Sequence, residues 1–288
     1  MPFAAQSILS LQLACQEYGE KIFNERTGEH TKTAFNTVLH YDANITNNLK
    51  NNFYTMPEGR TIRPYVAAAE LAWSLLGVKD ISFIEQYSKM WSKFTNNKNE
   101  VEAAYGYRWK RHFKRDQLFQ AMDQLKKNKS SRQVVVMAWD PRTDGLLNEG
   151  KIKNVPCPMG FQLNVDQNNI LYLTVFMRSS DLVVGLPYDF MFYDQLAVAI
   201  ANELELKKTE ITIFSANSHI YRKHETIVLD QLLHGEETVM LPKHYQSELS
   251  ISDIAQHPED YVEWIRMDTF QDVEKRKAIY DPKPEVFE

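Results

Sequence analysis

The sequence contains little cysteine and no long apolar run. Cys15 and Cys157 are the only cysteines in 288 residues, too few for a disulfide scaffold. No stretch reaches the roughly 18 uncharged apolar residues that a membrane-spanning helix requires. Residues 1–20 carry no positive charge ahead of their apolar part, so they predict an amphipathic helix and not a signal peptide. We therefore expect reduced thiols and a cytoplasmic protein.

Neither sign of charge dominates the chain. The 33 basic residues against 38 acidic ones give a net charge of −5 and a pI near 5.9. This balance disfavours a protein that coats nucleic acid and leaves room for a local pocket that binds a small anion. The sequence has no Walker loop, no GxGxxG motif before a helix and no Cys/His spacing typical of zinc. We expect no metal and neither a nucleic-acid nor a membrane partner.

The periodicity of the chain predicts both helices and strands. Residues 64–76 predict a buried helix, because Pro64 suits the first turn, apolar residues surround the helix and Gly77 follows its end. Further elements are predicted from β-branched or alternating runs and from helical periodicity. They are strands within 133–139, 160–166 and 170–178, a helix over 190–206 and a strand around 211–216.

No internal repeat or long linker divides the chain, and the polar stretches 44–52 and 96–99 are predicted to be surface loops. With 43% hydrophobic residues the chain has enough apolar material for a sizeable core. We predict the α+β class, with a central mixed sheet backed by helices, in one domain over residues 1–288.

Cys157 and Arg178 are candidates for chemistry because of where they lie. Cys157 stands between Pro156 and Pro158 at the start of a predicted strand, where it is either a held nucleophile or an inert buried thiol. Arg178 ends a buried strand and begins RSSD, a grouping of donors that suits a phosphate. A salt bridge to Asp181 is the structural alternative.

Three further residues have a functional and a structural interpretation. Glu70 lies inside the apolar helix 64–76, so its carboxyl is either partnered within the core or perturbed at a cleft. His219 and Tyr221 alternate along a strand and present two polar groups to one face. A hydrogen-bonded core histidine is the alternative for His219.

Ten landmarks occur along the chain in one order: ERTG (25–28), ELAW (70–73), YGYRW (105–109), SRQVVVMAWDP (131–141), VPC (155–157), Gln162, RSSD (178–181), GLPYD (185–189), SHIY (218–221) and YDPKP (280–284). In this order they resemble thymidylate synthase and its relatives, the pyrimidine-nucleotide hydroxymethylases. The landmarks cover nearly the whole chain, and ten in sequence make chance agreement negligible.

The resemblance implies a role for each matched residue. Cys157 adds to C6 of the pyrimidine, which activates C5 to attack the methylene of 5,10-methylenetetrahydrofolate, and Glu70 manages protons at the ring. The residues implied in catalysis are Cys157, Glu70, Asp189 and Tyr105. Those implied in substrate binding are Arg26, Arg132, Gln162, Arg178, Ser179, Ser180, Asp181, Gly185, Asp189, His219 and Tyr221. Those implied in folate binding are Trp91, Asp181, Gly185 and Tyr188.

The family also implies a homodimer that forms through one face of the sheet, with shared active sites. Arg132 then reaches the phosphate held by Arg26, Arg178 and Ser179 of the neighbouring subunit. Gln133, where the family has a second arginine, removes one donor from this group.

Three further differences from thymidylate synthase bear on the substrate and product. Asp189 replaces an asparagine, as in the deoxycytidylate hydroxymethylase of T-even phages, and an ionised carboxylate accepts from a 4-amino group but repels O4. Pro158 replaces a histidine beside the nucleophile. After YDPKP only EVFE remains, a shorter end than the segment that closes over the folate, which favours capture of the intermediate by water.

The sequence therefore predicts a (deoxy)cytidylate 5-hydroxymethyltransferase that uses methylenetetrahydrofolate. The enzyme alternatives are a deoxycytidylate 5-methyltransferase and a thymidylate synthase or hydroxymethylase that acts on dUMP. An alternative of another class is a lapsed enzyme that binds nucleotide or RNA as a regulator. The sequence does not distinguish ribose from deoxyribose.

Overall fold

One mixed sheet forms the centre of the protein. The computed structural model describes residues 4–5, 8–25, 27–42, 53–57, 63–145, 154–206, 208–234, 236–240 and 249–266. Eight strands in these ranges join in one sheet, whose pairs are both parallel and antiparallel. Their main order is β1 (Ala4–Ala5), β3 (Glu29–Asp42), β9 (Lys208–Tyr221), β7 (Ile170–Met177), β6 (Pro158–Val165) and β5 (Val135–Met137), with β2 (Glu20–Asn24) on β3 and β8 (Ser180–Asp181) on β9. The predicted α+β class is confirmed.

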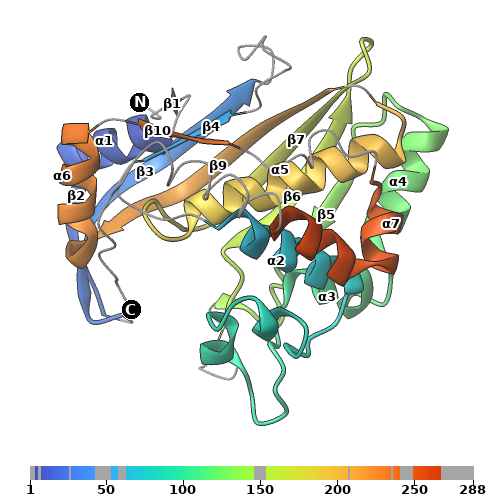
Figure 1. Ribbon diagram of the computed structural model, residues 1–288, viewed down its shortest axis with the longest axis horizontal. Helices are drawn as coiled ribbons and strands as arrows, with labels where there is room; N and C mark the ends of the chain where they lie inside the picture. The colour runs from blue at the N-terminus through green and yellow to red at the C-terminus, as the bar shows by residue number, and fades with distance from the viewer. Residues whose placement is uncertain are drawn as a thin grey trace.

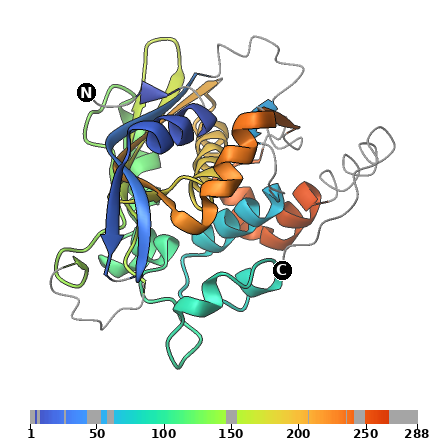
Figure 2. The ribbon, with the colours of Figure 1, turned by 90° about the vertical axis from the view of Figure 1, so that its left-hand side faces the viewer.

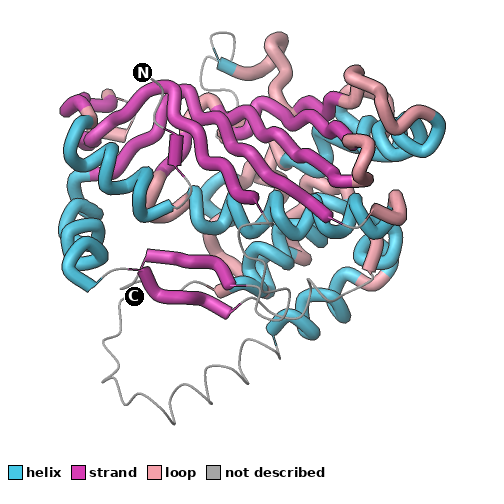
Figure 3. Tube along the Cα trace, turned by 90° about the horizontal axis from the view of Figure 1, so that it is seen from above, coloured by secondary structure: helices cyan, strands magenta, loops and turns pink. Residues whose placement is uncertain are grey.

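Two long helices cover one face of this sheet as successive layers. Helix α5 (Leu186–Glu203) packs on β7 and β9, and α2 (Pro64–Leu76) packs on the far side of α5 (Figures 1 and 3). Seen from the side, the sheet, α5 and α2 follow one another in that order (Figure 2).

The smaller elements surround these layers. The other described helices include α1 (Ile8–Tyr18), α3 (Tyr105–Tyr107), α4 (Gln117–Lys127), α6 (Glu225–His234) and α7 (Ile251–Gln256), and residues 258–266 are helical as well. Helix α3 continues into the π-helical turn η3 (Arg108–His112), and the short 3-10 turns are η1 (Ile84–Gln86), η2 (Trp91–Phe94) and η5 (Arg222–His224). A separate pair joins β4 (Phe53–Pro57) to β10 (Glu236–Met240). No helix in the described ranges is long and apolar enough to cross a membrane.

Local sequence accounts for the ends of the two long helices. Helix α2 spans the predicted residues, with Pro64 in its first turn and Gly77 at φ 65° as its C-cap. Helix α5 begins at Leu186, before the predicted residue 190, because Pro187 occupies its first turn. Asp189 lies in that turn, where the helix dipole favours a negative charge.

The strands have one buried and one open face. In β7, Leu173 and Val175 are fully buried, whereas Phe176, the residue after Val175, is 41% exposed. Phe214 of β9 is 42% exposed and stacks on Phe176, with ring centroids 6.0 Å apart. The described helices α5 and α2 cover only the buried face, so the other face presents apolar side chains to the surface.

The strands confirm the predicted positions but not all of the predicted lengths. Strand β9 runs from Lys208 to Tyr221, well beyond the predicted 211–216, and so includes His219. Strand β5 is shorter than predicted. Of the two predicted loops, 96–99 is a turn, and 44–52 lies outside the described residues.

Gly106 sets how closely α3 approaches α2. A Cβ atom at Gly106 would overlap the backbone of Ser74 in α2. We predict that Gly106→Ala lowers the free energy of unfolding by about 3 kcal/mol, because neither backbone segment can move without repacking the core. Gly28→Ala is the matched control, because Gly28 has φ 67° and nothing within 4 Å of its Cβ position. Only the strain of its left-handed backbone conformation should then lower the free energy of unfolding, by about 1 kcal/mol. If urea denaturation shows equal losses of unfolding free energy in the two variants, the close packing of α3 on α2 is contradicted.

Candidate active site

Cys157 lies where the chain enters the sheet. It directly precedes β6, and its carbonyl accepts a hydrogen bond at 2.9 Å from the amide of Arg178, which directly follows β7. The flanking prolines fix the backbone on either side of it. Cys157 is half-buried.

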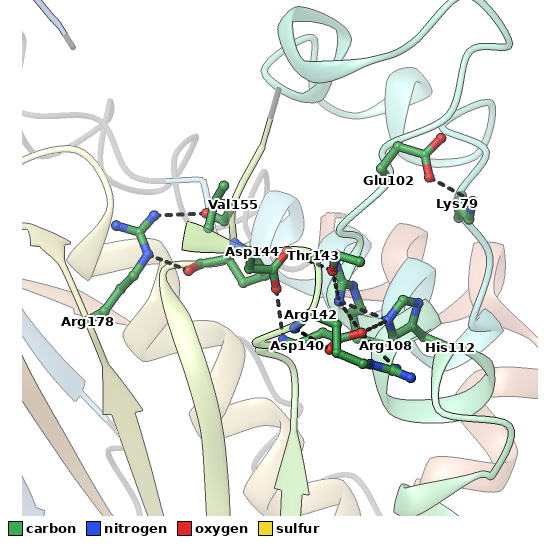
Figure 4. Close-up of polar contacts among 11 residues, drawn as sticks. Lys79, Glu102, Arg108, His112, Asp140, Arg142, Thr143, Asp144, Val155 and Arg178 are labelled. Atoms are coloured by element: carbon green, nitrogen blue, oxygen red, sulfur yellow. Dashed lines mark hydrogen bonds and ion pairs between the residues drawn. The ribbon is translucent and has the colours of Figure 1, made fainter. Parts of the chain in front are cut away.

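Arg178 holds the segment that carries Cys157. Its Nε donates to the Pro156 carbonyl at 2.8 Å and its Nη2 to the Val155 carbonyl at 2.9 Å, as Figure 4 shows. Nη2 also lies 3.9 Å from Cys157 Sγ. A guanidinium at this position favours the thiolate over the thiol. The alternative salt bridge to Asp181 does not form between these two described residues, and Nη1 makes no hydrogen bond to the part of the chain that the structure describes.

Two carboxyl groups meet between α2 and α5. Glu70 of α2 accepts a hydrogen bond at 3.1 Å from the indole Nε1 of Trp91. Burial, reinforced by the charge of Asp189, raises the pKa of Glu70 to about 8. Burial, reinforced by Asp181, raises the pKa of Asp189 to about 7. Both groups therefore exchange protons near neutral pH, which general acid–base catalysis requires.

Aromatic side chains join these acids to Cys157. The Tyr105 ring meets Trp91 edge-to-face, with centroids 5.7 Å apart. Burial raises the pKa of Tyr105 well above its ordinary value, and the charges of Cys157 and Asp189 add to that effect. The structure thus brings Cys157, Glu70, Asp189 and Tyr105 together from four separate elements.

A second group of candidates lies where β8 and β9 pair. Asp181 is paired with His219 across these strands, and its Oδ1 accepts from the amides of Val183 and Val184 at 2.9 and 3.0 Å. The rings of His219 and Tyr221 meet edge-to-face at 5.0 Å. His219 is half-buried.

The segment between β8 and α5 connects the two groups. A Cβ atom at Gly185 would lie 3.3 Å from the Asp181 carbonyl and 3.6 Å from Asp189 Oδ2, so the chain turns tightly here. The Tyr188 hydroxyl accepts from the amide of Arg63 at 3.3 Å. Ser179 is half-buried, whereas Ser180 is 2% exposed, with no described partner for its hydroxyl.

Three predicted residues are not placed in this group. Arg132 is exposed ahead of β5, and Gln162 of β6 donates to the Arg132 carbonyl at 3.4 Å. Gln162 alternates with buried Phe161 and Leu163, which directs it to the open face of the sheet and away from α5. Arg26 lies outside the described residues.

The structure also reveals two site residues that the sequence did not suggest. Tyr193 lies one helical turn after Asp189 on α5, and burial together with the charges of Asp189 and Cys157 raises the pKa of its hydroxyl. The i, i+4 spacing from Asp189 is the signal that would have identified it. Asn217 Oδ1 lies 3.1 Å from His219 Nδ1 and orients that ring, a contact between alternate residues of β9.

The chain is similar to known proteins over most of its length. The sequence profile of the family described as thymidylate synthase matches residues 11–278. A protein named thymidylate synthase from Buchnera aphidicola subsp. Acyrthosiphon pisum (strain APS) is 30% identical over 227 residues, covering 76% of this chain and 80% of that protein. Proteins of the same name from Baumannia cicadellinicola subsp. Homalodisca coagulata and Corynebacterium aurimucosum are 31% and 27% identical, covering 54% and 72% of this chain and 59% and 75% of theirs. The profile match includes every candidate residue described above.

The raised pKa of Glu70 has a consequence for stability. Between its ordinary value of 4.5 and about 8 the folded protein binds more protons than the unfolded chain, so this group destabilises the fold progressively as pH rises through that window. Glu70→Gln keeps the acceptor for Trp91 and removes the titration. We predict that the variant gains stability over wild type by at least about 1 kcal/mol between pH 5 and pH 8.

Thermal denaturation of both proteins across this pH range measures the difference. Glu205→Gln, at an exposed position, is the control and should follow wild type throughout. A constant offset between Glu70→Gln and wild type at every pH would show that Glu70 does not titrate in this window.

Proposed function

Because the chain belongs to the thymidylate synthase family, whose members transfer a one-carbon unit from 5,10-methylenetetrahydrofolate to a nucleoside monophosphate, we propose that its substrate is a cytidine-type monophosphate, dCMP or CMP. The observation that carries this proposal is Asp189, half-buried at the start of α5 with a pKa raised to about 7. The relatives named thymidylate synthase favour the alternative in which dUMP is methylated.

The proposed reaction begins at Cys157. Its thiolate, stabilised by Arg178, adds to C6 of the pyrimidine and sends electrons toward C4. A neutral Asp189 carboxyl donates its proton to N3 as this occurs, and the resulting carboxylate accepts from the 4-amino group. Cytosine can take that proton, whereas N3 of uracil already carries one. The proton transfer therefore favours cytosine in the transition state, where selectivity is decided.

The activated C5 then attacks the methylene group of the folate. Glu70, whose pKa of about 8 keeps it largely protonated at neutral pH, is proposed to donate and accept protons at the ring and the one-carbon unit. We propose that water then captures the exocyclic methylene and gives the 5-hydroxymethyl product. The end segment that bears on this choice, 280–288, lies outside the described residues.

The candidate binding residues divide into those proposed for the nucleotide and those proposed for the folate. Arg26, Arg178 and Ser179 are proposed to bind the phosphate, and His219 and Tyr221 the sugar 3′-hydroxyl. Asn217 supports the sugar assignment, since its contact with Nδ1 orients the His219 ring. The remaining proposed contacts are Ser180 for the nucleotide and Trp91, Asp181, Gly185 and Tyr188 for the folate. Gln162 faces the open side of the sheet beside Arg132 and is left out of this assignment.

We also propose that the protein is a cytoplasmic homodimer of single-domain subunits. The open face of the sheet supports the dimer, because its large apolar side chains are unusual at a solvent-exposed surface. Those more than a third exposed on the strands of this sheet are Phe23, Phe35, Val135, Met159, Phe176 and Phe214. Arg132 and Gln162 lie beside this face, so a second copy seated on it would bring Arg132 toward the partner's phosphate site.

The base preference is tested at Asp189. Asp189→Asn keeps the side-chain shape but cannot deliver a proton to N3, and its amide donates to O4. We predict that the ratio of kcat/KM for the cytosine nucleotide over the uracil nucleotide falls by at least about 100-fold, or roughly 2.7 kcal/mol. Glu203→Gln removes a carboxylate from the other end of α5 and is the control, which should leave this ratio near its wild-type value. A wild-type preference for dUMP, or an unchanged ratio in Asp189→Asn, would show that another group selects the base.

The shared site is tested by subunit mixing. Chains carrying Arg132→Ala or Cys157→Ala should each be inactive, but a hybrid dimer contains one site in which both residues are intact. We predict that the mixture regains activity, toward a quarter of wild type when exchange is complete. A monomer in sedimentation, or no recovery after exchange has been demonstrated, would contradict the assignment of Arg132 to the partner's site.

A further inference from the structure

Arg108 is a buried cation that the proposed reaction does not use. It lies in η3, three residues after Tyr105, and its side chain is 1% exposed. Its Nη2 lies 3.0 Å from Asp144 Oδ1, and its Nη1 lies 3.9 Å from Asp140 Oδ2. Figure 4 shows this group between the turn that carries Arg108 and the loop 140–145. An ion pair this deeply buried fixes the relative position of the two segments that supply its charges.

The loop is closed on itself around the same carboxylates. The Asp140 amide donates to Asp144 Oδ2 at 2.8 Å, and the Asp144 amide donates to the Asp140 carbonyl at 2.9 Å. Asp140 has two further polar partners, Arg142 at 2.9 Å and His112 at 2.6 Å. For Asp144, by contrast, Arg108 is the only ion-pair partner in the described part of the chain. The Arg108–Asp144 contact therefore ties the loop to η3, together with the contact between His112 of η3 and Asp140.

From this loop a line of contacts leads to Cys157. A Cβ atom on Gly145 would lie 2.9 Å from Cζ2 of Trp139, so the backbone of the loop rests directly on that ring. Arg178 also lies over the Trp139 ring, with its Cζ 5.8 Å from the ring centroid. Arg178 in turn holds the Cys157 segment and lies 3.9 Å from its sulfur.

We propose that Arg108 is a positioning residue for Cys157. Its ion pair with Asp144 holds the loop 140–145 against Trp139, and Trp139 holds the guanidinium of Arg178 beside the Cys157 sulfur. Because Arg108 follows Tyr105 in one continuous helical segment, the same ion pair sets the position of the thiol relative to Tyr105. The inference rests on the proposed role of Cys157 as nucleophile, but its first consequence is the acidity of the thiol and not turnover.

The test is the double substitution Arg108→Gln/Asp144→Asn, which removes both charges and leaves no buried ion unpaired. Alkylation of Cys157 by iodoacetamide is measured against pH in a Cys15→Ala background, so that one thiol reacts. We expect the midpoint of the pH profile of alkylation to rise by about one pH unit, because Arg178 stabilises the Cys157 thiolate less in the variant. Below the midpoint this shift makes alkylation about 10-fold slower. We also expect kcat to fall about 10-fold while the KM for the nucleotide changes less than about 2-fold.

Lys79→Gln/Glu102→Gln is the matched control, because it removes an ion pair of 2.9 Å from the same part of the fold (Figure 4). It should leave the alkylation profile and kcat as in wild type. The positioning role is refuted if the Arg108→Gln/Asp144→Asn protein has a lower melting temperature but the same alkylation profile and kcat as the control.

Two further outcomes keep the test decisive. If the double variant does not fold, Arg108→Lys retains the charge but not the planar fork, and an alkylation profile identical to wild type in that variant overturns the proposal. If the wild-type protein turns over none of CMP, dCMP, UMP and dUMP, the proposed function fails. The pH profile of Cys157 alkylation still tests the role of Arg108 separately.

Discussion

The contact between the Arg178 guanidinium and the Cys157 segment is the interaction on which the site depends. Two carbonyl hydrogen bonds, to Val155 and Pro156, fix a stretch of chain that has prolines but no regular secondary structure. Because Arg178 follows β7 and Cys157 precedes β6, adjacent antiparallel strands bring the cation to the sulfur. The sheet thus supplies the geometry, and the arginine supplies the charge that a reactive thiol requires.

The layered fold supplies the second requirement, which is a set of acids with pKa values near neutrality. Glu70 comes from α2 and Asp189 from α5, and the packing of these helices half-buries both residues, which raises the pKa of each carboxyl. Each charge raises the cost of ionising its neighbour, as in other paired carboxylates. A carboxyl that is neutral at the working pH can donate a proton to the base, and this property connects the fold to the proposed choice of cytosine.

Much of the fold was predictable because it is encoded locally. Pro64 and Gly77 mark the ends of α2, and the alternation in 160–178 identifies β6 and β7 without any tertiary information. The extension of β9 through His219 was not predictable by the same means, since its burial alternation changes phase between Ser215 and Ser218. Pattern recognition assumes a constant period, and this strand does not keep one.

The candidate site was predictable only through the order of its motifs. The local sequence gives Glu70 and Cys157 a structural interpretation as well as a functional one, and the family resemblance is what associates them with Asp189. The Arg108–Asp144 pair had no such signal, because 36 positions separate two charges that resemble surface residues in the sequence. Only the packing of η3 against the loop 140–145 shows that both are buried. Tertiary contacts of this kind are what a single sequence does not contain.

The central claim, that this enzyme modifies a cytosine nucleotide, is tested most directly by its products. The purified protein is incubated with methylenetetrahydrofolate and, separately, with CMP, dCMP, UMP and dUMP, and the nucleotide products are identified by mass. The account predicts that CMP or dCMP gains a hydroxymethyl group while UMP and dUMP remain unchanged. A methyl group gained by dUMP, with both cytosine nucleotides unreacted, would contradict it.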